Sequence, residues 1–308
     1  MYYPKVSFVV LNWNGFEDTV ECLESLQKIA YKNYEIVVVD NGSDGDDAVI
    51  LQTRFGASIY VVVNDNNYGA AEGYNSGLRY ILANLQPRPD YIVVMNNDLI
   101  VDGHFLSELV NVAEADKDIG IVGPKIYYYD YKGRKDIIWS AGGKINPWLP
   151  HVYHHIGENH PDLPKYQKLT TVDWITAALF MVKTDVIEKV GFFNSMYFLG
   201  LEDTEYCLKV REHGFKIVYV PAAKVWHKVG VSIRKANKSY ADPSLYYRFI
   251  KRNFSRFIYI YQLLILPFVI SYWGVLYLIR HRDKRRMMIF LRNFANFILR
   301  RDARFLNN

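Results

Sequence analysis

The chain reads Tyr91-Ile92-Val93-Val94-Met95-Asn96-Asn97-Asp98 at the end of its first third, an apolar run that stops at two amides and a carboxylate. Such a short, nearly continuous hydrophobic run is typical of a strand buried on both faces of a parallel sheet. A carboxylate at the end of that strand is well placed to hold a metal ion on a diphosphate. Three earlier runs have the same character: Val6–Leu11, Glu35–Asp40 and Ile59–Val63.

Helical segments alternate with these runs. Glu17–Ile29 separates the first two runs and Ala70–Leu85 separates the last two, and both have apolar residues at helical spacing. This alternation predicts an α/β fold with a doubly wound, mostly parallel sheet. In such a sheet the ligand crevice lies at the carboxyl ends of the strands.

The pattern changes after Asp98. A predicted helix at His104–Ala115 leads into a stretch rich in Gly, Pro, Tyr and Trp, from Gly120 to Asp173, which is typical of mixed strands and substrate-specific loops. We expect four further elements: a strand or short helix at Trp174–Val182, a helix at Thr184–Val190 with Thr184 as N-cap, a helix at Glu202–His213 closed by Gly214, and a strand at Lys216–Val220 ended by Pro221.

The C-terminal part has a different composition. From Leu245 onward there are 13 Lys or Arg residues against two Asp, although the whole 308-residue chain carries only +5. The uncharged segment Phe257–Ile279 is long enough to span a bilayer. However, Pro267 interrupts it and basic residues flank both sides, which favours amphipathic helices, hinged near Pro267 and continued by Met287–Leu299, that lie on an anionic membrane. A helical pair packed on the body or on a dimer partner is the alternative, and nucleic acid is not expected as a partner.

Small, amide or carboxylate residues follow each of the four predicted strands. Taken singly, each group is an ordinary turn, because Asn, Asp and Gly are turn residues. Four such groups on one edge of a sheet instead offer hydrogen bonds to a base, a ribose and phosphates. The candidate ligands are Asn12, Asn14, Asp40, Asn41, Asn67, Gly73, Asn75, Asn96, Asn97 and Asp98.

A second acidic pair, Glu202-Asp203, opens a predicted helix after the turn Phe198–Leu201. A carboxylate there can take a proton from an incoming alcohol. The alternative is that the two acids only interact favourably with the helix dipole. Together with Asp98, the pair suggests sugar transfer from a nucleotide donor.

These segments resemble the inverting family 2 glycosyltransferases, which have the GT-A fold. The resemblance rests on the strand ending in Asp40-Asn41-Gly42-Ser43, on the turn from Asn67 to Gly77, and on Asn96-Asn97-Asp98, which is similar to the family's DxD motif. It extends through Trp174–Cys207 and His227, and covers about Val6 to Ser232. Within the family, the segments are most similar to rhamnosyltransferase-type enzymes of bacteria and archaea.

The resemblance implies roles for the candidate residues. Asp98 would hold Mn²⁺ or Mg²⁺ on the donor's diphosphate, with His227 as a second protein ligand. Asp203 would be the general base. Glu202 would orient the acceptor or share the role of base, and Trp174 would contact the acceptor sugar or pack in the core.

Composition, motifs and the resemblance together suggest a domain division and a class of substrate. Residues 1–98 would bind the nucleotide-sugar, 99–240 would bind the acceptor, and 241–308 would associate with the membrane. Asp40 suits a pyrimidine, so we expect a UDP- or dTDP-sugar, such as dTDP-rhamnose. The acceptor would be a lipid-linked or cell-surface glycan, reached from the cytoplasmic face of the membrane. Two cysteines, Cys22 and Cys207, cannot form a disulfide framework, which fits a reducing compartment.

The sequence also departs from the family pattern. Asn96 stands where the DxD-like motif usually has its first acid, and an amide oxygen is a weaker ligand for a hard cation. Ala177-Ala178 and Asn194-Ser195 replace Gly-Ala and Asp-Glu, which could alter the fit of the acceptor. The Gln-x-x-Arg-Trp signature of processive synthases is absent, so we expect addition of a single sugar.

Two alternatives stay open. A sugar nucleotidyltransferase has a similar sheet, but the loop Asn12–Phe16 lacks the basic residues of that class. A catalytically degenerate glycan-binding or scaffold subunit is conceivable because of Asn96.

Overall fold

The computed structural model describes residues 3–146, 148, 153–229, 243–258, 260–261 and 264–265. The chain divides into two compact units, here called the α/β unit (residues 1–145 and 153–236) and the C-terminal unit (residues 146–152 and 237–308). Residues 146–152 therefore group with C-terminal residues, although they lie within the range 99–240 that is expected to bind the acceptor.

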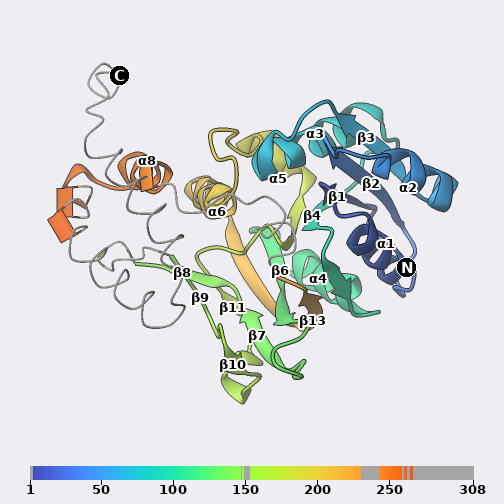
Figure 1. Cartoon of the computed structure of the whole chain (residues 1–308). Helices are drawn as coiled ribbons and strands as arrows, with labels where there is room; N and C mark the ends of the chain where they lie inside the picture. Colours follow the sequence, from blue (N-terminus) through green and yellow to red (C-terminus); the bar gives the residue numbers. More distant parts are fainter. Residues whose placement is uncertain are drawn as a thin grey trace. The chain divides into compact units, whose positions relative to one another are not determined.

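Strands and helices alternate through the first half of the α/β unit (Figure 1). All four predicted strands are present, and each continues at its carboxyl end into an asparagine. The strands are β1 Val6–Asn12, β2 Tyr34–Asn41, β3 Tyr60–Asn64, β4 Tyr91–Asn96, β5 Leu99–Val101, β6 Ile119–Tyr128, β7 Ile137–Ser140, β8 Gly143–Ile145, β9 Tyr153–His155, β10 His160–Pro161, β11 Thr170–Thr171, β12 Leu179–Lys183 and β13 Lys216–His227. The helices of this unit are α1 Phe16–Leu26, α2 Asp47–Phe55, α3 Gly69–Asn84, α4 Phe105–Ala115, α5 Thr184–Val190 and α6 Glu202–Glu212, with 3₁₀ turns at Gly56–Ser58 and Pro164–Tyr166.

The central sheet is mixed, with the strand order β10-β7-β6-β12-β4-β1-β2-β3. The expected parallel pairing holds for β3, β2, β1 and β4. Beyond β4, however, β12 is antiparallel to both β4 and β6, while β13 is parallel to β6 and antiparallel to β5. The prediction of a mostly parallel sheet is therefore correct only for the first half, because β12 follows a long irregular segment and no βαβ crossover fixes its direction.

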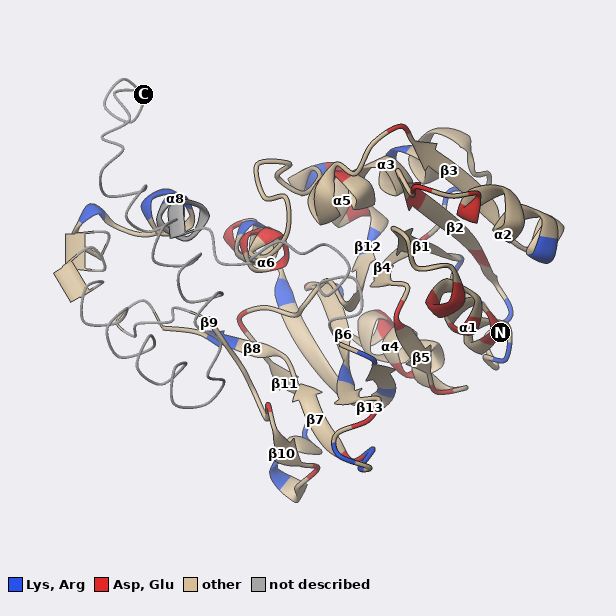
Figure 2. Cartoon of the chain, viewed as in Figure 1, with Lys and Arg blue, Asp and Glu red and all other residues tan. Residues whose placement is uncertain are grey.

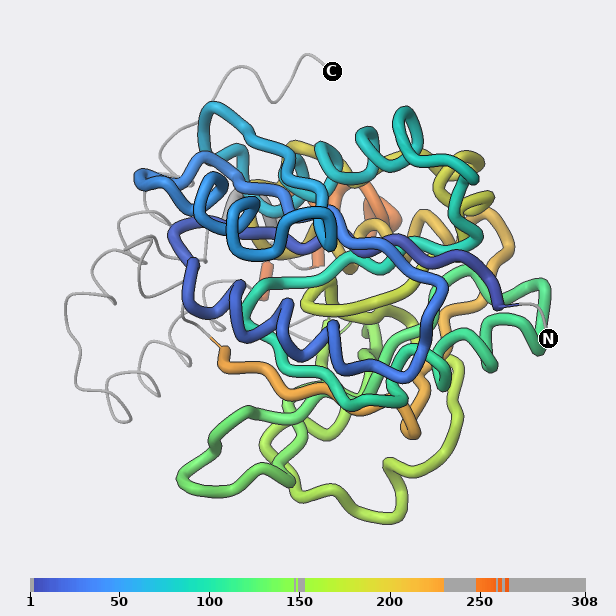
Figure 3. Tube along the Cα trace, turned by 90° about the vertical axis from the view of Figure 1, so that its right-hand side faces the viewer, coloured from blue at the N-terminus to red at the C-terminus, as the bar shows by residue number. Residues whose placement is uncertain are grey.

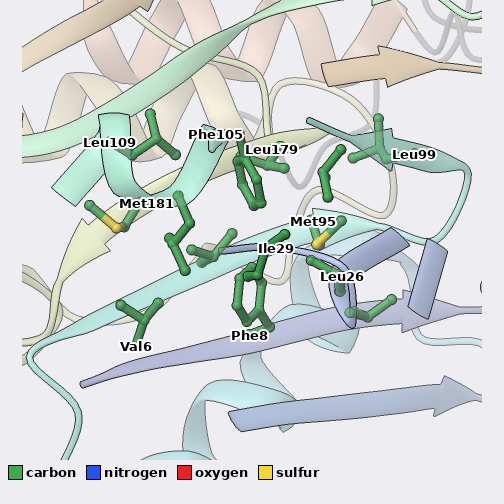
Figure 4. Close-up of a cluster of buried hydrophobic side chains, with 14 of the residues drawn as sticks. Val6, Phe8, Leu26, Ile29, Met95, Leu99, Phe105, Leu109, Leu179 and Met181 are labelled. Carbon is green, nitrogen blue, oxygen red and sulfur yellow. The ribbon is translucent and has the colours of Figure 1, made fainter. Parts of the chain in front are cut away.

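Two hydrophobic cores cover the two faces of this sheet. On one face Phe8 and Met95 pack with Leu26 of α1 and Phe105 of α4 (Figure 4). On the other face the alternate strand residues pack against α3, α5 and α6. The side view in Figure 3 shows the N-terminal strands and helices in blue, with the segment between β6 and β12 forming loops at the opposite end of the unit.

Two local predictions were wrong, and one short helix was not predicted. Strand β13 does not stop at Pro221 but continues to His227, because a register shift between Val220 and Lys224 accommodates a residue that has no N–H to donate. Thr184 is the first residue of α5 rather than its N-cap, and it makes no side-chain capping bond. The short helix α2 between β2 and β3 was not predicted.

The C-terminal unit contains helix α8, Pro243–Asn253, on which Lys and Arg residues are prominent (Figure 2). After it, the rings of Phe257 and Tyr261 lie 6.0 and 5.5 Å from the ring of Trp148, and the Tyr261 hydroxyl donates to the Trp148 carbonyl at 3.0 Å. No helix in the described part of the chain is long and apolar enough to cross a membrane. Most of the predicted amphipathic helices, at Phe257–Ile279 and Met287–Leu299, lies outside the described residues.

Candidate functional site

The carboxyl ends of β1, β2 and β4 meet at one edge of the sheet. Asn12 pairs in register with Asp40, and Leu11 pairs with Asn96. The buried Asn12 amide donates to Asp40 Oδ1 at 2.9 Å, and the Thr19 hydroxyl donates to Asn12 Oδ1 at 2.8 Å. Burial raises the pKa of Asp40, although hydrogen bonds from Ser43 and Asn12 oppose that effect. Asn12 therefore fixes the position of the Asp40 carboxyl group.

Several residues predicted to bind the nucleotide-sugar form hydrogen bonds that hold the turns at this edge of the sheet together. Asn97 is buried and donates to Thr19 Oγ1 at 2.8 Å, which ties the end of β4 to α1. Asn14 exchanges hydrogen bonds with Asp44, its amide donating to the Asp44 carboxylate and its oxygen accepting from the Asp44 N–H, each at 2.8 Å. A direct contact of either residue with a donor stays a prediction.

The turn from Asn67 to Gly77 is built in the same way. Asn41 donates to Asn67 Oδ1 at 3.1 Å. The Asn75 side chain accepts a hydrogen bond from the Phe193 N–H at 3.0 Å and donates one to the Phe193 carbonyl at 2.9 Å. Gly73 is needed for close packing of α3 on the sheet, since a Cβ there would lie 2.6 Å from Leu11 Cδ1. These residues form the framework of the predicted nucleotide site, and their contacts with a nucleotide stay predictions.

Asp98 and His227 come together from distant parts of the sequence. The extension of β13 past Pro221 pairs His227 with Leu99, next to Asp98. His227 Nε2 lies 3.0 Å from Asp98 Oδ1, both side chains are 6% exposed, and the Lys228 N–H donates to the Asp98 carbonyl at 3.0 Å. Burial would raise the pKa of the Asp98 carboxyl, but the contact with His227 and the charge of Lys228 hold that pKa below its usual value. Asp98 is therefore an anion at neutral pH.

This pair fits a divalent cation. A carboxylate oxygen suits both Mg²⁺ and Mn²⁺, and Mn²⁺, a transition metal, tolerates an imidazole nitrogen better than Mg²⁺ does. Nδ1 of the buried His227 ring has no hydrogen-bond partner among the described residues. The described residues contain no group of three or more His, Cys, Asp or Glu side chains that could hold a metal ion. A cation at Asp98 and His227 would therefore take most of its ligands from the diphosphate or from water.

Glu202 and Asp203 begin α6, where acidic residues gather at the helix start (Figure 2). Asp203 Oδ2 accepts a hydrogen bond from the Ala177 N–H at 3.1 Å, and Oδ1 accepts one from the Thr204 N–H at 2.6 Å. Oε2 of the buried Glu202 has no partner in the described part of the chain. Burial and then the charge of Asp203 raise the pKa of Glu202, and burial also raises the pKa of Asp203. Asp203 is thus held rigidly, whereas one Glu202 oxygen is unused.

A series of aromatic and imidazole rings, which the sequence did not indicate, leads from His227 to Trp174. Ring-to-ring distances along it are 4.5 Å from His227 to Trp139, 5.0 Å from Trp139 to His155, and 4.7 Å from His155 to Trp174. Burial and the charge of His227 lower the pKa of His155 to about 4, so His155 is neutral. Trp174 is 2% exposed and packs in the core, and its contact with an acceptor stays a prediction.

Tyr74 is another residue that the sequence did not indicate. It lies in α3, and its hydroxyl lies 2.6 Å from Asn96 Oδ1 and 3.0 Å from the Ala177 carbonyl. Burial, and then the charges of Glu202, Asp203 and Asp98, raise its pKa well above the usual range. All three carboxylates therefore lie within electrostatic reach of one hydroxyl. Its position in the Asn67–Gly77 motif is one that the motif leaves free, so no local signal marked it.

Comparisons with known proteins agree with this arrangement. Residues 4–241 match a family described as glycosyltransferase like family 2. The chain is 26% identical to the low-salt glycan biosynthesis hexosyltransferase Agl10 of Haloferax volcanii, over 88% of this chain and 83% of that protein. It is 23% identical to the N-acetylglucosaminyl-diphospho-decaprenol L-rhamnosyltransferase of Mycobacterium tuberculosis, over 72% of this chain and 73% of that protein.

Solved structures share the fold. GalNAc-T7, crystallised with UDP, GalNAc and Mn²⁺, has a TM-score of 0.59 at 18% identity, over 73% of this chain and 43% of that chain. The mannosyltransferase PcManGT from Pyrobaculum calidifontis, in complex with GDP-Man and Mn²⁺, has a TM-score of 0.54 at 16% identity, over 99% of this chain and 84% of that chain. At such identities the likeness concerns the fold, which confirms the predicted GT-A type. Because the family match covers most of the chain, this protein belongs to glycosyltransferase family 2 and is a glycosyltransferase.

Proposed function

We propose that this glycosyltransferase moves one sugar from a UDP- or dTDP-sugar, such as dTDP-rhamnose, to a hydroxyl group of a lipid-linked or cell-surface glycan. The reaction would require Mn²⁺ or Mg²⁺ and would invert the anomeric centre. The observation that carries the proposal is that the buried Tyr74 hydroxyl lies 2.6 Å from Asn96 Oδ1, two residues before Asp98, and 3.0 Å from the carbonyl of Ala177, whose N–H donates to Asp203. A cation-binding carboxylate and a candidate base thus belong to one site.

Each acidic residue has a distinct role in this proposal. Asp98 and His227 would bind the cation, which when bound stabilises negative charge on the leaving diphosphate. Asp203, fixed by the Ala177 and Thr204 N–H groups, would take the proton of the acceptor hydroxyl. The pKa of Asp203 is raised toward neutral pH, and a general base works efficiently when its pKa lies near the pH of the reaction. Glu202 would use its unpaired Oε2 to orient the acceptor.

The donor proposal rests on Asp40 and on the relatives. The Asp40 carboxyl, fixed by Asn12, could accept a hydrogen bond from the N3–H of a pyrimidine. A rhamnosyltransferase among the relatives supports a deoxysugar donor. Because the two solved structures with this fold hold UDP and GDP-Man, the fold alone does not select the base.

The acceptor proposal rests on the same relative, whose name includes a diphospho-decaprenol lipid. A product assay tests the reaction: the enzyme is incubated with a dTDP- or UDP-sugar, Mn²⁺ and a polyprenyl-diphosphate N-acetylglucosamine acceptor. The expected product has the anomeric configuration opposite to that of the donor, read by NMR. Retention of configuration would refute the assignment of Asp203 as the base.

The C-terminal unit would attach the protein to the cytoplasmic face of the membrane. Trp148 and Phe257 are 51% and 68% exposed, and exposed basic residues, including Lys251 and Arg256, lie in the same segment. Lys251 and Arg256 are neighbours of Phe257 in the chain, and Trp148 belongs to the same compact unit. Aromatic and basic side chains together favour an anionic lipid interface. We expect sedimentation with phosphatidylglycerol vesicles but not with phosphatidylcholine vesicles, and weaker sedimentation of a Trp148→Ala, Lys251→Glu variant. Equal sedimentation with both kinds of vesicle would contradict the electrostatic part of this proposal.

A further inference from the structure

We propose that Tyr74 is a positioning residue, which fixes the Asn96 amide with its NH₂ group turned toward the diphosphate of the donor. This inference rests on the proposed donor site. Tyr74 is 1% exposed in α3, and Asn96 is the last residue of β4, two positions before Asp98.

The distances decide which atom of Asn96 faces Tyr74. The phenol hydroxyl has a single hydrogen and two oxygen neighbours, Asn96 Oδ1 at 2.6 Å and the Ala177 carbonyl at 3.0 Å. A separation of 2.6 Å is normal for O–H···O but shorter than the usual range for N–H···O. The atom of Asn96 beside the hydroxyl is therefore its oxygen. The NH₂ group points away from Tyr74, and no described residue accepts a hydrogen bond from it.

The environment of Tyr74 keeps this arrangement fixed. Burial and three nearby carboxylates hold the hydroxyl in its protonated form, so it remains a hydrogen-bond donor. The ring itself packs on Phe193, with centroids 5.6 Å apart, and does not depend on the hydroxyl for its place. Asn96 Oδ1 already accepts a hydrogen bond from Tyr74, and the NH₂ group is the part of the amide without a partner among the described residues; its N–H groups suit phosphate oxygens rather than a cation.

Tyr74 also joins the donor and acceptor sides of the site. Its hydroxyl contacts the Ala177 carbonyl, and the N–H of the same residue donates to Asp203 Oδ2. The Asn96 N–H donates to the Ala178 carbonyl at 2.9 Å. One hydroxyl thus connects the end of β4 with the segment that holds the candidate base.

The test is a binding measurement on Tyr74→Phe, which keeps the ring and removes only the hydroxyl. Calorimetry with Mn²⁺ would use whichever of UDP, dTDP and GDP the native protein binds most tightly. We expect about tenfold weaker binding in the variant, the size of one hydrogen bond to a charged group. The matched control is Tyr219→Phe, which removes another buried hydroxyl, donated to the Tyr166 carbonyl at 2.9 Å, and should leave nucleotide binding unchanged.

A double-mutant cycle then asks whether Tyr74 acts through Asn96. Asn96→Ala should weaken nucleotide binding by a similar factor, and the double variant should bind no more weakly than Asn96→Ala alone. Native-like binding by Tyr74→Phe, or additive effects of the two changes, would overturn this inference and leave the proposed function intact. Failure of the native protein to bind any of the three nucleotides would instead overturn the proposed function, and this inference with it.

Discussion

Replacing Asp203 by asparagine should separate catalysis from donor binding. The substitution keeps one oxygen, which can still accept the two hydrogen bonds from Thr204, its N–H at 2.6 Å and its hydroxyl at 3.1 Å. The new NH₂ group then lies opposite the Ala177 N–H, which loses its hydrogen bond. This loss should lower the free energy of unfolding by about 1–3 kcal/mol. Removal of a carboxylate whose pKa is raised by burial offsets part of this cost at neutral pH. We therefore expect a folded protein.

The effect on the chemical step should be much larger. Loss of a general base typically slows a reaction by about 10²–10⁴-fold, which corresponds to about 3–5 kcal/mol in the activation free energy. The assay is release of the nucleoside diphosphate at saturating donor, Mn²⁺ and polyprenyl-diphosphate N-acetylglucosamine acceptor, measured across pH. In the native enzyme the rate should rise with pH as Asp203 ionises, and this rise should come at a higher pH than for an ordinary aspartate because burial raises the pKa of Asp203. In Asp203→Asn this rise should be absent, while the dissociation constant of the donor stays the same.

Glu202→Gln is the comparison that makes the test decisive. This variant leaves the Asp203 hydrogen bonds in place and should keep a rate within about tenfold of the native enzyme. If Asp203→Asn keeps the native rate and Glu202→Gln loses it, Glu202 is the base and the assignment made here is refuted.

Three further results are expected. His227→Ala should weaken Mn²⁺-dependent nucleotide binding by at least about tenfold in calorimetry, and an unchanged Mn²⁺ titration would exclude His227 as a ligand. Because the folded-state pKa of Glu202 is raised, its ionisation destabilises the native fold as pH rises above about 4.3, by about 1.4 kcal/mol per pKa unit of the difference. Glu202→Gln should therefore gain more unfolding free energy over the native protein at pH 8 than at pH 5 in urea, and a pH-independent difference would contradict this. Gly77→Ala would place a Cβ 2.4 Å from Val9 Cγ1 and should lower the free energy of unfolding by about 1–3 kcal/mol in the same experiment. Gly45→Ala, where the nearest atom would lie 3.9 Å from the new Cβ, should lower it much less. Equal losses of unfolding free energy would argue against the close contact of α3 with β1.

The parts of the fold that the sequence predicted are those with a local cause. Short runs of Val and Ile gave the first four strands, and each run ended next to the asparagine that closes its strand. Asp98 and the pair Glu202-Asp203 stood out as candidates because each belongs to a short motif at the end of a strand or the start of a helix.

What the sequence did not reveal depends on long-range contacts. Strand β13 continues past Pro221 only because β6 and β5 pair with its second half and a register shift absorbs the proline. Trp139, His155 and Tyr74 enter the site from segments whose local pattern reads as loop or as core. Their roles follow from partners far away in the sequence, which no periodicity records.

The most direct test of the central claim is a donor panel with Mn²⁺, in which UDP-, dTDP- and GDP-sugars are assayed for binding and slow hydrolysis by the native protein and by Asp98→Ala. We expect that a pyrimidine nucleotide-sugar is bound and hydrolysed by the native protein, and that Asp98→Ala abolishes its binding. If the native protein binds none of these donors with any divalent metal, the proposed metal-dependent transfer is wrong, and the scaffold alternative takes its place.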